Sequence, residues 1–162
     1  MNPLKSKIIK FTYKRKVTHH PVLMGGVQIP TTESTKYLGL ILDNKLTWNL
    51  HITSLIQKLR QRIRQVKHLV SGQSPTSLHY KRLVYTSLIR PIWQYSCSIW
   101  GSASPSQINR IQRIQNRYLR LITGAPWYVR NTTLHADLGI PEDLSVLRTS
   151  YKQLHSSCLS YI

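Results

Sequence analysis

The chain has 162 residues, 41% of them apolar, which suffices for one domain with its own hydrophobic core. Lysine and arginine number 23 against five aspartates and glutamates, so the formal net charge is +18. A charge of this size on a small protein favours a polyanionic partner, with nucleic acid as the first expectation. Residues 44–136 contain no acidic side chain. This scarcity argues against two-metal phosphoryl transfer and glycoside cleavage, because both need converging carboxylates.

The first 46 residues predict short strands. Residues 7–13 place Ile9, Phe11 and Tyr13 on one side of an extended strand. Residues 22–29 form a hairpin around Gly25 and Gly26, because two adjacent glycines readily adopt the positive φ angles of a tight hairpin turn. Residues 35–42 form an apolar run of strand length, in which Gly39 indicates either a bulge, a close approach of backbone or ligand, or simple relief of packing.

The apolar period then changes from two to about 3.6, which predicts helices. A first helix over 48–71 buries one apolar stripe and ends at Gly72. Its other faces carry five basic residues without any acid to pair them: Lys58, Arg60, Arg62, Arg64 and Lys67. We therefore expect this helix to face anions.

A second helix is predicted over 75–100, with Ser74 as N-cap, Pro75 in the first turn and a kink at Pro91. The segment is apolar enough to raise the possibility of a membrane span. Arg90 and Gln94 lie in its middle, however, and such groups are costly at the centre of a bilayer. A buried, kinked helix is the favoured interpretation, and we expect no membrane partner.

A third helix is predicted over 105–123, between the N-cap Ser104 and the C-cap Gly124. Four arginines recur every three or four residues along it and form one stripe: Arg110, Arg113, Arg117 and Arg120. Guanidinium groups stacked without acids repel one another in isolation but suit a phosphate backbone. Phosphate contact and a merely solvated face both remain open from sequence.

The segment 125–131 is predicted to be a loop with two large aromatic side chains, Trp127 and Tyr128, followed by Arg130. These side chains could stack on bases or pin the loop onto the core, and pinning is the favoured interpretation. A short helix over 133–138 and a last helix from Pro141 onward complete the chain. Glu142 and Asp143 follow Pro141 at that helix start, where acids stabilise the exposed N–H groups, so we assign them no catalytic role.

The other residues with possible chemistry indicate neither a metal site nor nucleophilic catalysis. Cys97 and Cys158 form no CxxC motif, and no histidine has ligand-like spacing to either cysteine. The N-terminal residues lack the apolar stretch of a signal peptide. We assign no catalytic residue and no metal ligand, and expect an intracellular protein, in the nucleus or the cytoplasm.

Short blocks distributed along nearly the whole chain carry a resemblance. They are Lys36-Tyr37-Leu38-Gly39, Leu46-Thr47-Trp48 with His51-Ile52, Leu88-Ile89-Arg90-Pro91, Trp100-Gly101, Pro126-Trp127-Tyr128-Val129-Arg130-Asn131 and Leu138-Gly139-Ile140-Pro141. In their order and spacing these blocks resemble the last part of the reverse transcriptase (RNA-directed DNA polymerase) of jockey-type non-LTR retrotransposons, from the end of the palm onward.

The resemblance implies a role for each part of the chain. The hairpin with Lys36, Tyr37, Leu38 and Gly39 would be the primer grip, and the helices after it the thumb, which together hold an RNA template and a DNA primer. The family's catalytic aspartates lie upstream, in a palm segment and a Tyr/Phe-x-Asp-Asp turn that this sequence lacks, as it lacks the fingers. Mg²⁺ is expected only for the full-length polymerase, and no polymerase activity is expected from this chain alone.

The predicted fold class is α+β, mainly α. We divide the chain into the end of the palm with the primer-grip hairpin (1–46), a helical thumb (47–124) and a post-thumb loop with the C-terminal helix (125–162). Residues 1–46 are expected to be marginally ordered without the rest of their sheet. The predicted nucleic-acid-binding residues are Lys58, Arg60, Arg62, Arg64, Lys67, Arg110, Arg113, Arg117, Arg120, Trp127 and Arg130.

Two alternatives to the polymerase segment remain open from sequence. The first is a stand-alone basic RNA- or DNA-binding protein without enzymatic activity, and the second is a membrane-surface binder that uses its basic amphipathic helix. A preference for primer–template junctions over blunt duplex favours the polymerase segment. Competition by anionic vesicles favours the membrane binder.

Overall fold

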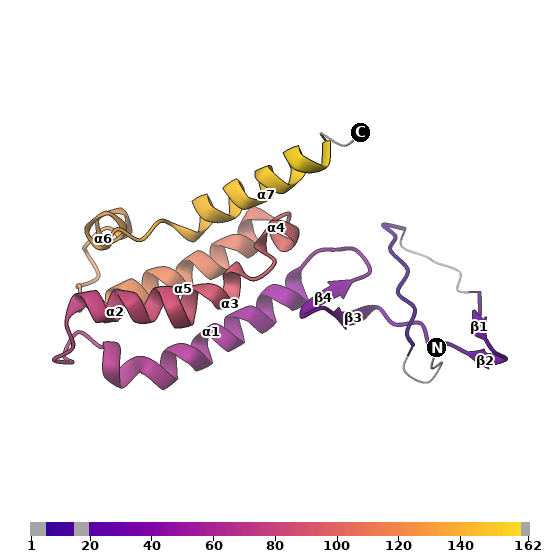
Figure 1. Ribbon diagram of the computed structural model, residues 1–162, viewed down its shortest axis with the longest axis horizontal. Helices are drawn as coiled ribbons and strands as arrows, with labels where there is room; N and C mark the ends of the chain where they lie inside the picture. Colours follow the sequence, from indigo (N-terminus) through magenta and orange to yellow (C-terminus); the bar gives the residue numbers. More distant parts are fainter. Residues whose placement is uncertain (1–5, 15–19, 160–162) are drawn as a thin grey trace. The chain divides into compact units, whose positions relative to one another are not determined.

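The computed structural model describes residues 6–14 and 20–159. The chain divides into two compact units, Met1–His51 and Ile52–Ile162. Two small antiparallel sheets of two strands each lie in the first unit, and helices make up the second (Figure 1). The predicted fold class, α+β and mainly α, is therefore confirmed.

The predicted hairpin at Gly25 and Gly26 is present. Strands β1 (Leu23–Met24) and β2 (Val27–Gln28) pair antiparallel, with Leu23 opposite Gln28. The two glycines between them have φ angles of 57° and 79°. Positive φ at both central residues is typical of the type I′ turn, whose twist matches that of the flanking strands.

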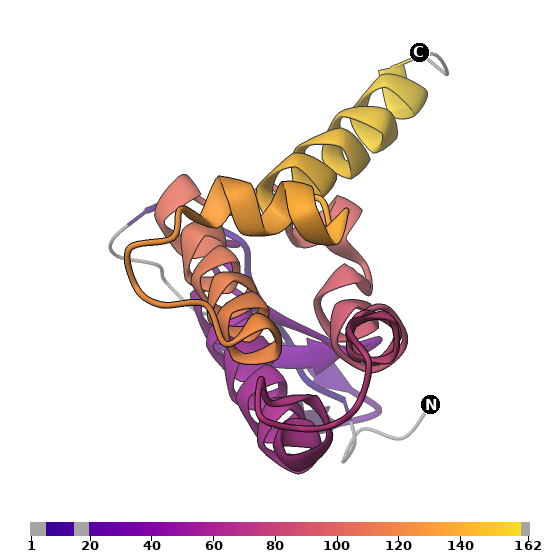
Figure 2. The ribbon, with the colours of Figure 1, turned by 90° about the vertical axis from the view of Figure 1, so that its left-hand side faces the viewer.

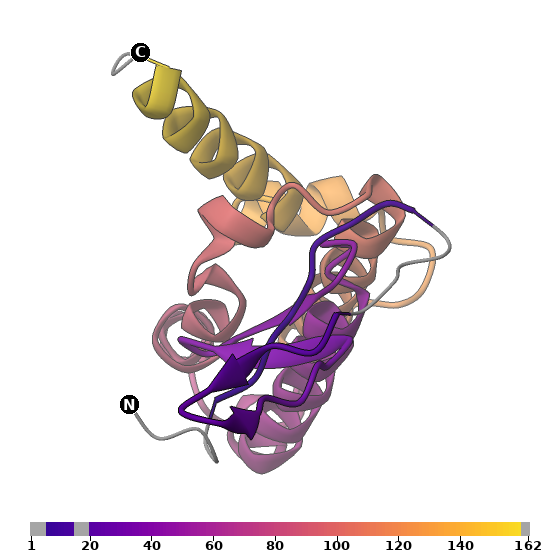
Figure 3. The ribbon, with the colours of Figure 1, turned by 90° about the vertical axis from the view of Figure 1, so that its right-hand side faces the viewer.

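The apolar run 35–42 forms a second hairpin, as the resemblance to reverse transcriptases implied for Lys36–Gly39, and not one strand of the length that its apolar spacing indicated. Strands β3 (Ser34–Tyr37) and β4 (Leu40–Asp43) pair antiparallel in the register Ser34 to Asp43 (Figure 3). Leu38 (φ 45°) and Gly39 (φ 82°) form the turn between them. The hairpin is therefore confirmed, and a bulge within one continuous strand was wrong, because positive φ at Leu38 and Gly39 reverses the chain.

The strand predicted over 7–13 is reduced to one parallel bridge between Ile8 and Thr31. On the face predicted to be half buried, Phe11 is 51% and Tyr13 is 85% exposed. The alternating pattern was misleading because nothing in the described part of this unit covers that face. This prediction is wrong beyond Ile8.

The turn that leads from β4 into the first helix is held by Asp43. Its carboxylate accepts hydrogen bonds from the Thr47 amide (2.9 Å), the Thr47 hydroxyl (2.9 Å) and the Trp48 amide (3.1 Å). Trp48 is buried although its φ is +62°, a backbone conformation that non-glycine residues rarely adopt. The carboxylate thus stabilises a strained turn at the start of α1.

Helix α1 (Asn49–Val70) ends the first unit and begins the second. It agrees with the predicted helix over 48–71, and the predicted apolar positions face the core of the second unit. Six of them are buried: Ile52, Leu55, Ile56, Leu59, Val66 and Val70.

The helix predicted over 75–100 is broken into four pieces: α2 (Leu78–Val84), the π-helix η2 (Tyr85–Ile89), α3 (Arg90–Gln94) and α4 (Cys97–Trp100). The Arg90 amide donates to the Tyr85 carbonyl five residues back, so the wider turn directly precedes Pro91. Ser96 has a φ of +51°, and the Trp100 indole N–H donates to the Tyr95 carbonyl at 3.0 Å across the break. The continuous helix was therefore wrong, and so was its predicted start, because Ser77 and not Ser74 is the N-cap and α2 begins after Pro75, at Leu78.

Helix α5 (Pro105–Thr123) has the predicted bounds and ends at Gly124 in the left-handed conformation. Helices α6 (Asn131–Leu138) and α7 (Asp143–Leu159) follow. Within the second unit, α1, α5 and the α2–α3 segment lie side by side, and α6 crosses at one end (Figures 1 and 2). Helix α7 packs against α4 and α5.

Buried polar groups fix α6 to the middle of α5. The Gln115 amide donates to the Tyr85 hydroxyl and to the Pro141 carbonyl, both at 2.9 Å. His135 on α6 donates from Nδ1 to the Ile140 carbonyl at 2.8 Å, and its Nε2 lies 2.9 Å from Asn116 Oδ1. Because unpaired polar groups are costly inside a protein, this network specifies one arrangement of η2, α5 and α6.

Candidate nucleic-acid interface

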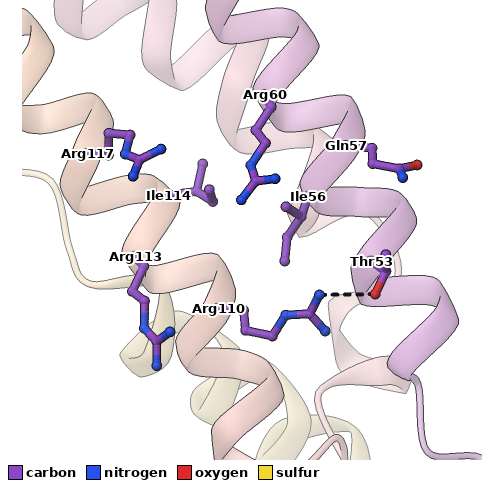
Figure 4. A pocket seen from close by; sticks show the side chains of 8 residues that line it. All are labelled: Thr53, Ile56, Gln57, Arg60, Arg110, Arg113, Ile114 and Arg117. Atoms are coloured by element: carbon purple, nitrogen blue, oxygen red, sulfur yellow. Dashed lines mark hydrogen bonds between the residues drawn. The ribbon is translucent and has the colours of Figure 1, made fainter.

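Helices α1 and α5 run in the same direction and enclose a groove. Near the N-terminal ends of the two helices, Arg110 of α5 donates to the Thr53 hydroxyl of α1 at 3.1 Å. Just beyond their C-terminal ends, Gly124 lies against Gly72. The groove holds about 360 Å³ (Figure 4). Its lining residues are Thr53, Ile56, Gln57, Arg60, Arg110, Arg113, Ile114 and Arg117.

A second hollow of about 430 Å³ continues the groove toward the C-terminal end of α1. It shares Arg60, Ile114 and Arg117 with the first and adds Ile63 and Arg64. Five arginines from two helices therefore line one continuous surface, which we call the arginine groove: Arg60, Arg64, Arg110, Arg113 and Arg117.

Helical spacing explains why these arginines converge. Residues three or four apart on a helix share a face, so Arg110, Arg113 and Arg117 form one row on α5, and Arg60 and Arg64 form another on α1. Figure 4 shows Arg60 and Arg117 extending from opposite walls, with Ile56 and Ile114 between the helices. The two isoleucines thus form an apolar floor, and the guanidinium groups line the walls of the groove.

The arginines of the groove differ in the hydrogen bonds that they make within the protein. Arg110 donates to Gln107 Oε1 at 2.6 Å as well as to Thr53, so its guanidinium is oriented across the groove. Arg113 and Arg117 are exposed and have no hydrogen-bond partner in the described part of the chain. None of the residues that line the groove is acidic. The groove is thus suited to an anion that brings several negative charges in a row.

The predicted set on α1 divides between two faces. Arg60 and Arg64 lie in the arginine groove, whereas Lys58 and Arg62 line a separate hollow of about 210 Å³ with Ile92 of α3. Lys67 is exposed near the end of α1 and lines neither surface. Sequence periodicity could not make this distinction, because the partners of each helix face were unknown.

Arg120, the fourth arginine of the predicted stripe, is separate from the groove. It donates to the carbonyls of Pro126 (2.7 Å) and Val129 (2.6 Å) and to Asn131 Oδ1 (2.9 Å). These bonds use three of its five N–H donors, so Arg120 holds the loop after α5.

The aromatic residues of the loop 125–131 do not pin it to the core. Trp127 is 88% and Tyr128 is 71% exposed. The pinning interpretation was wrong because Arg120, through hydrogen bonds, does what the aromatic rings were expected to do. Arg130 is also exposed, at the N-cap of α6.

The predicted primer-grip residues occupy the tip of the β3–β4 hairpin in the first unit. Lys36 and Tyr37 end β3, and Leu38 and Gly39 form the turn (Figure 3). Tyr37 is 62% and Leu38 71% exposed. An exposed tyrosine and an exposed leucine at a hairpin tip form an accessible contact surface.

The structure also bears on metal and membrane sites. Within residues 6–14 and 20–159, His, Cys, Asp and Glu side chains form no group of three or more that could hold a metal ion. No helix in the described ranges is both long and apolar enough to cross a bilayer.

Comparison with known proteins identifies the class. The chain is similar to RNA-directed DNA polymerases of mobile elements, as its sequence blocks predicted, and this resemblance is confirmed. It is 45% identical over 138 residues to the probable RNA-directed DNA polymerase from transposon X-element of Drosophila melanogaster. It is 40% identical over 141 residues to that from transposon BS of the same species, and 33% identical over 150 residues to that from mobile element jockey of Drosophila funebris.

These alignments cover 85%, 86% and 92% of this chain but only 15–16% of the length of the three relatives. The chain is therefore homologous to a short segment of such polymerases. No protein-family model matches it, and no solved structure does.

Proposed function

We propose that this chain binds the phosphate backbone of a template–primer duplex through the arginine groove, as the primer-grip, thumb and post-thumb segment of a retrotransposon reverse transcriptase. One observation carries the proposal. Two helices place five arginines on one groove without a neighbouring carboxylate, an arrangement that repels itself unless an anion lies in it. Homology to RNA-directed DNA polymerases supports a nucleic acid as that anion.

Backbone geometry supports a duplex as the ligand. Double-stranded DNA carries one charge per about 1.7 Å of helix axis, so a row of guanidinium groups meets a row of phosphates. Each guanidinium can donate two parallel hydrogen bonds to one phosphate. Such contacts position the ligand without reading its sequence, and we therefore expect low sequence specificity.

Within this proposal the chain positions nucleic acid, and the catalytic carboxylates come from the palm of the parent polymerase. The hairpin tip with Tyr37 and Leu38 contacts the primer strand, residues 47–124 act as the thumb and residues 125–162 as its extension. Magnesium is held by carboxylates and waters. The described residues offer no such cluster, so they do not fit a magnesium site and no step assigned to this chain involves one.

The affinity of single variants for a blunt duplex tests the proposal. Arg113→Gln and Arg117→Gln each remove an exposed groove charge, and Lys152→Gln removes an exposed charge from α7 as the matched control. We expect each groove variant to weaken binding about tenfold, uniformly across duplex sequences, and the control by less than about twofold. Groove variants that bind like the Lys152→Gln protein contradict the proposal.

The same assay separates the stand-alone binder from the polymerase segment. A recessed primer–template that binds more tightly than the blunt duplex supports the polymerase segment. Equal affinity for the two ligands supports a generic basic surface.

A further inference from the structure

The loop between α5 and α6 presents two aromatic rings on a tight turn. The Val129 amide donates to the Pro126 carbonyl at 3.2 Å, which closes a turn with Trp127 and Tyr128 at its two central positions. The ring centroids of these residues lie 6.0 Å apart, with an interplanar angle of 79°. Both rings therefore project from the tip of one turn.

Arg120 holds this turn in place through hydrogen bonds. One guanidinium bonds to the carbonyls of Pro126 and Val129, the first and last residues of the turn, and to Asn131 in the first turn of α6. Arg120 itself lies on the well-packed helix α5, between the buried residues Leu119 and Ile122. The rings are thus held by a rigid support, although neither ring belongs to the core.

Exposure distinguishes Trp127 from every other tryptophan of the chain. The sequence contains four tryptophans, and the other three, Trp48, Trp93 and Trp100, are at most 4% exposed. Large apolar rings left in water next to a preorganised backbone indicate a surface that is covered by a ligand.

We propose that Trp127 and Tyr128 form a stacking platform for unpaired bases of a single-stranded nucleic acid. The proposal rests on the proposed function, since the duplex part of the same ligand lies in the arginine groove. Every base has a π face, so such stacking is tolerant of sequence and needs only an aromatic ring that is already in place.

Charge favours nucleic acid over a protein surface as the occupant. Arg130 is exposed two residues after Tyr128, and residues 44–136 contain no acidic side chain. An anionic strand can place its phosphate near Arg130 while its base meets a ring, as in single-strand binding sites that combine basic grooves with aromatic platforms.

The platform is anchored on α5 about one helical turn beyond Arg117 of the arginine groove. Arg117 lines the groove and Arg120 holds the turn, and three residues correspond to about 4.5 Å along a helix axis. A strand that leaves a duplex at the end of the groove therefore reaches the platform within a few nucleotides.

Binding to three matched ligands tests this proposal with the full chain. The ligands are a blunt duplex, the same duplex with short single-stranded overhangs, and the same duplex with overhangs of equal length made of abasic residues. The abasic overhang keeps the phosphates and removes the bases, so it separates stacking from charge. We expect the wild-type chain to bind the overhang about tenfold more tightly than its abasic counterpart.

The double variant Trp127→Ala/Tyr128→Ala should lose this difference and bind the overhang and its abasic counterpart with equal affinity. A variant that keeps the preference for bases overturns the platform, and so does tighter binding to phosphatidylserine vesicles than to the overhang. Failure of the proposed function gives a different result, in which Arg113→Gln and Arg117→Gln leave the affinity for the blunt duplex unchanged.

Tryptophan fluorescence gives a second readout that needs no variant. Because the other tryptophans are buried, collisional quenching by iodide reports on Trp127. The overhang that carries bases should quench the fluorescence of Trp127 and also protect the remaining fluorescence from quenching by iodide. The abasic overhang should have neither effect. Equal effects of the two overhangs contradict stacking on Trp127.

Discussion

Arg117 and Arg120, about one helical turn apart on α5, have different roles. Arg117 projects into the groove, whereas Arg120 has its guanidinium occupied by two carbonyls and an amide oxygen of the next loop. Their spacing is helical in the sequence, so both were expected to face a phosphate. The difference arises from Gly124, whose left-handed conformation turns the chain back over the last turn of α5.

A second residue-scale effect concerns Asp43. Burial raises the pKa of its carboxyl group, but hydrogen bonds from Thr47 and Trp48 outweigh burial and hold the pKa below the ordinary value of 3.8. A carboxylate with a lowered pKa in the folded state stabilises the fold at pH values above its unfolded pKa. That contribution is lost as the pH falls through 3.8 toward the lower folded value.

The variant Asp43→Asn should therefore be less stable than wild type by about 1 kcal/mol at pH 7, because it weakens the cap of the turn into α1. At pH 2.5, below the ordinary pKa of 3.8, the difference should shrink, since the unfolded chain then binds a proton at this group and the advantage of the lowered pKa declines. Urea unfolding at the two pH values, followed by circular dichroism, measures both differences. An equal loss at both values contradicts the role assigned to the carboxylate.

At the scale of elements, the sequence predicted the long regular helices correctly but not the breaks within the segment 75–100. The bounds of α1 and α5 were predicted because each has a sustained apolar stripe and a glycine at its end. The segment 75–100 is also followed by a glycine, but neither the π-helix before Pro91 nor the break at Ser96 has a signature in apolar spacing. The β3–β4 turn was implied by the family resemblance and not by apolar spacing, because Leu38, an apolar residue, takes a positive φ that residues of its kind seldom adopt.

The groove itself depends on how α1 and α5 meet. A Cβ atom at Gly72 would lie 2.9 Å from the Cα and 3.0 Å from the nitrogen of Gly124, both of them backbone atoms. No side-chain rotation can relieve that contact. The ends of the two helices approach this closely because residue 72 is glycine.

Gly72→Ala should therefore destabilise the chain by about 1–3 kcal/mol, as overpacking against a backbone does. The neighbouring exposed residue Gln73 gives the control, because Gln73→Ala meets no such contact and should change stability by less than about 0.5 kcal/mol. Thermal unfolding of both variants measures the effect. Equal stability of the two variants contradicts the close approach of the helices.

For the whole molecule, composition predicted the charge of the binding surface but not its place. The fold class followed from the change of apolar period near residue 46, whereas the arginine groove required knowledge of which helix faces become neighbours. Arg60 and Arg62 are equivalent in sequence, yet α5 flanks one and α3 the other. The sequence also could not show that Trp127 is exposed, because its exposure follows from the hydrogen bonds that Arg120 makes to the loop.

The two units should differ in stability. Among the described residues of the first unit, the buried apolar side chains are only Ile29, Leu40 and Trp48, whereas α1 and α5 bury long apolar stripes in the second. We expect amide hydrogens of residues 20–43 to exchange at least about 100-fold faster than those in the middle of α5, because little buried area opposes local opening. Hydrogen exchange measured by NMR tests this, and equal protection of both regions contradicts the expected marginal order of residues 1–46.

The salt dependence of duplex binding tests the central claim most directly. Each phosphate neutralised contributes about −0.9 to the slope of log affinity against log salt, so five groove arginines give a slope of at least about −4.5. The double variant Arg113→Gln/Arg117→Gln should have a slope shallower by about 1.8 on the same blunt duplex. If the slopes of the wild-type chain and the double variant are equal, the arginine groove does not hold the duplex.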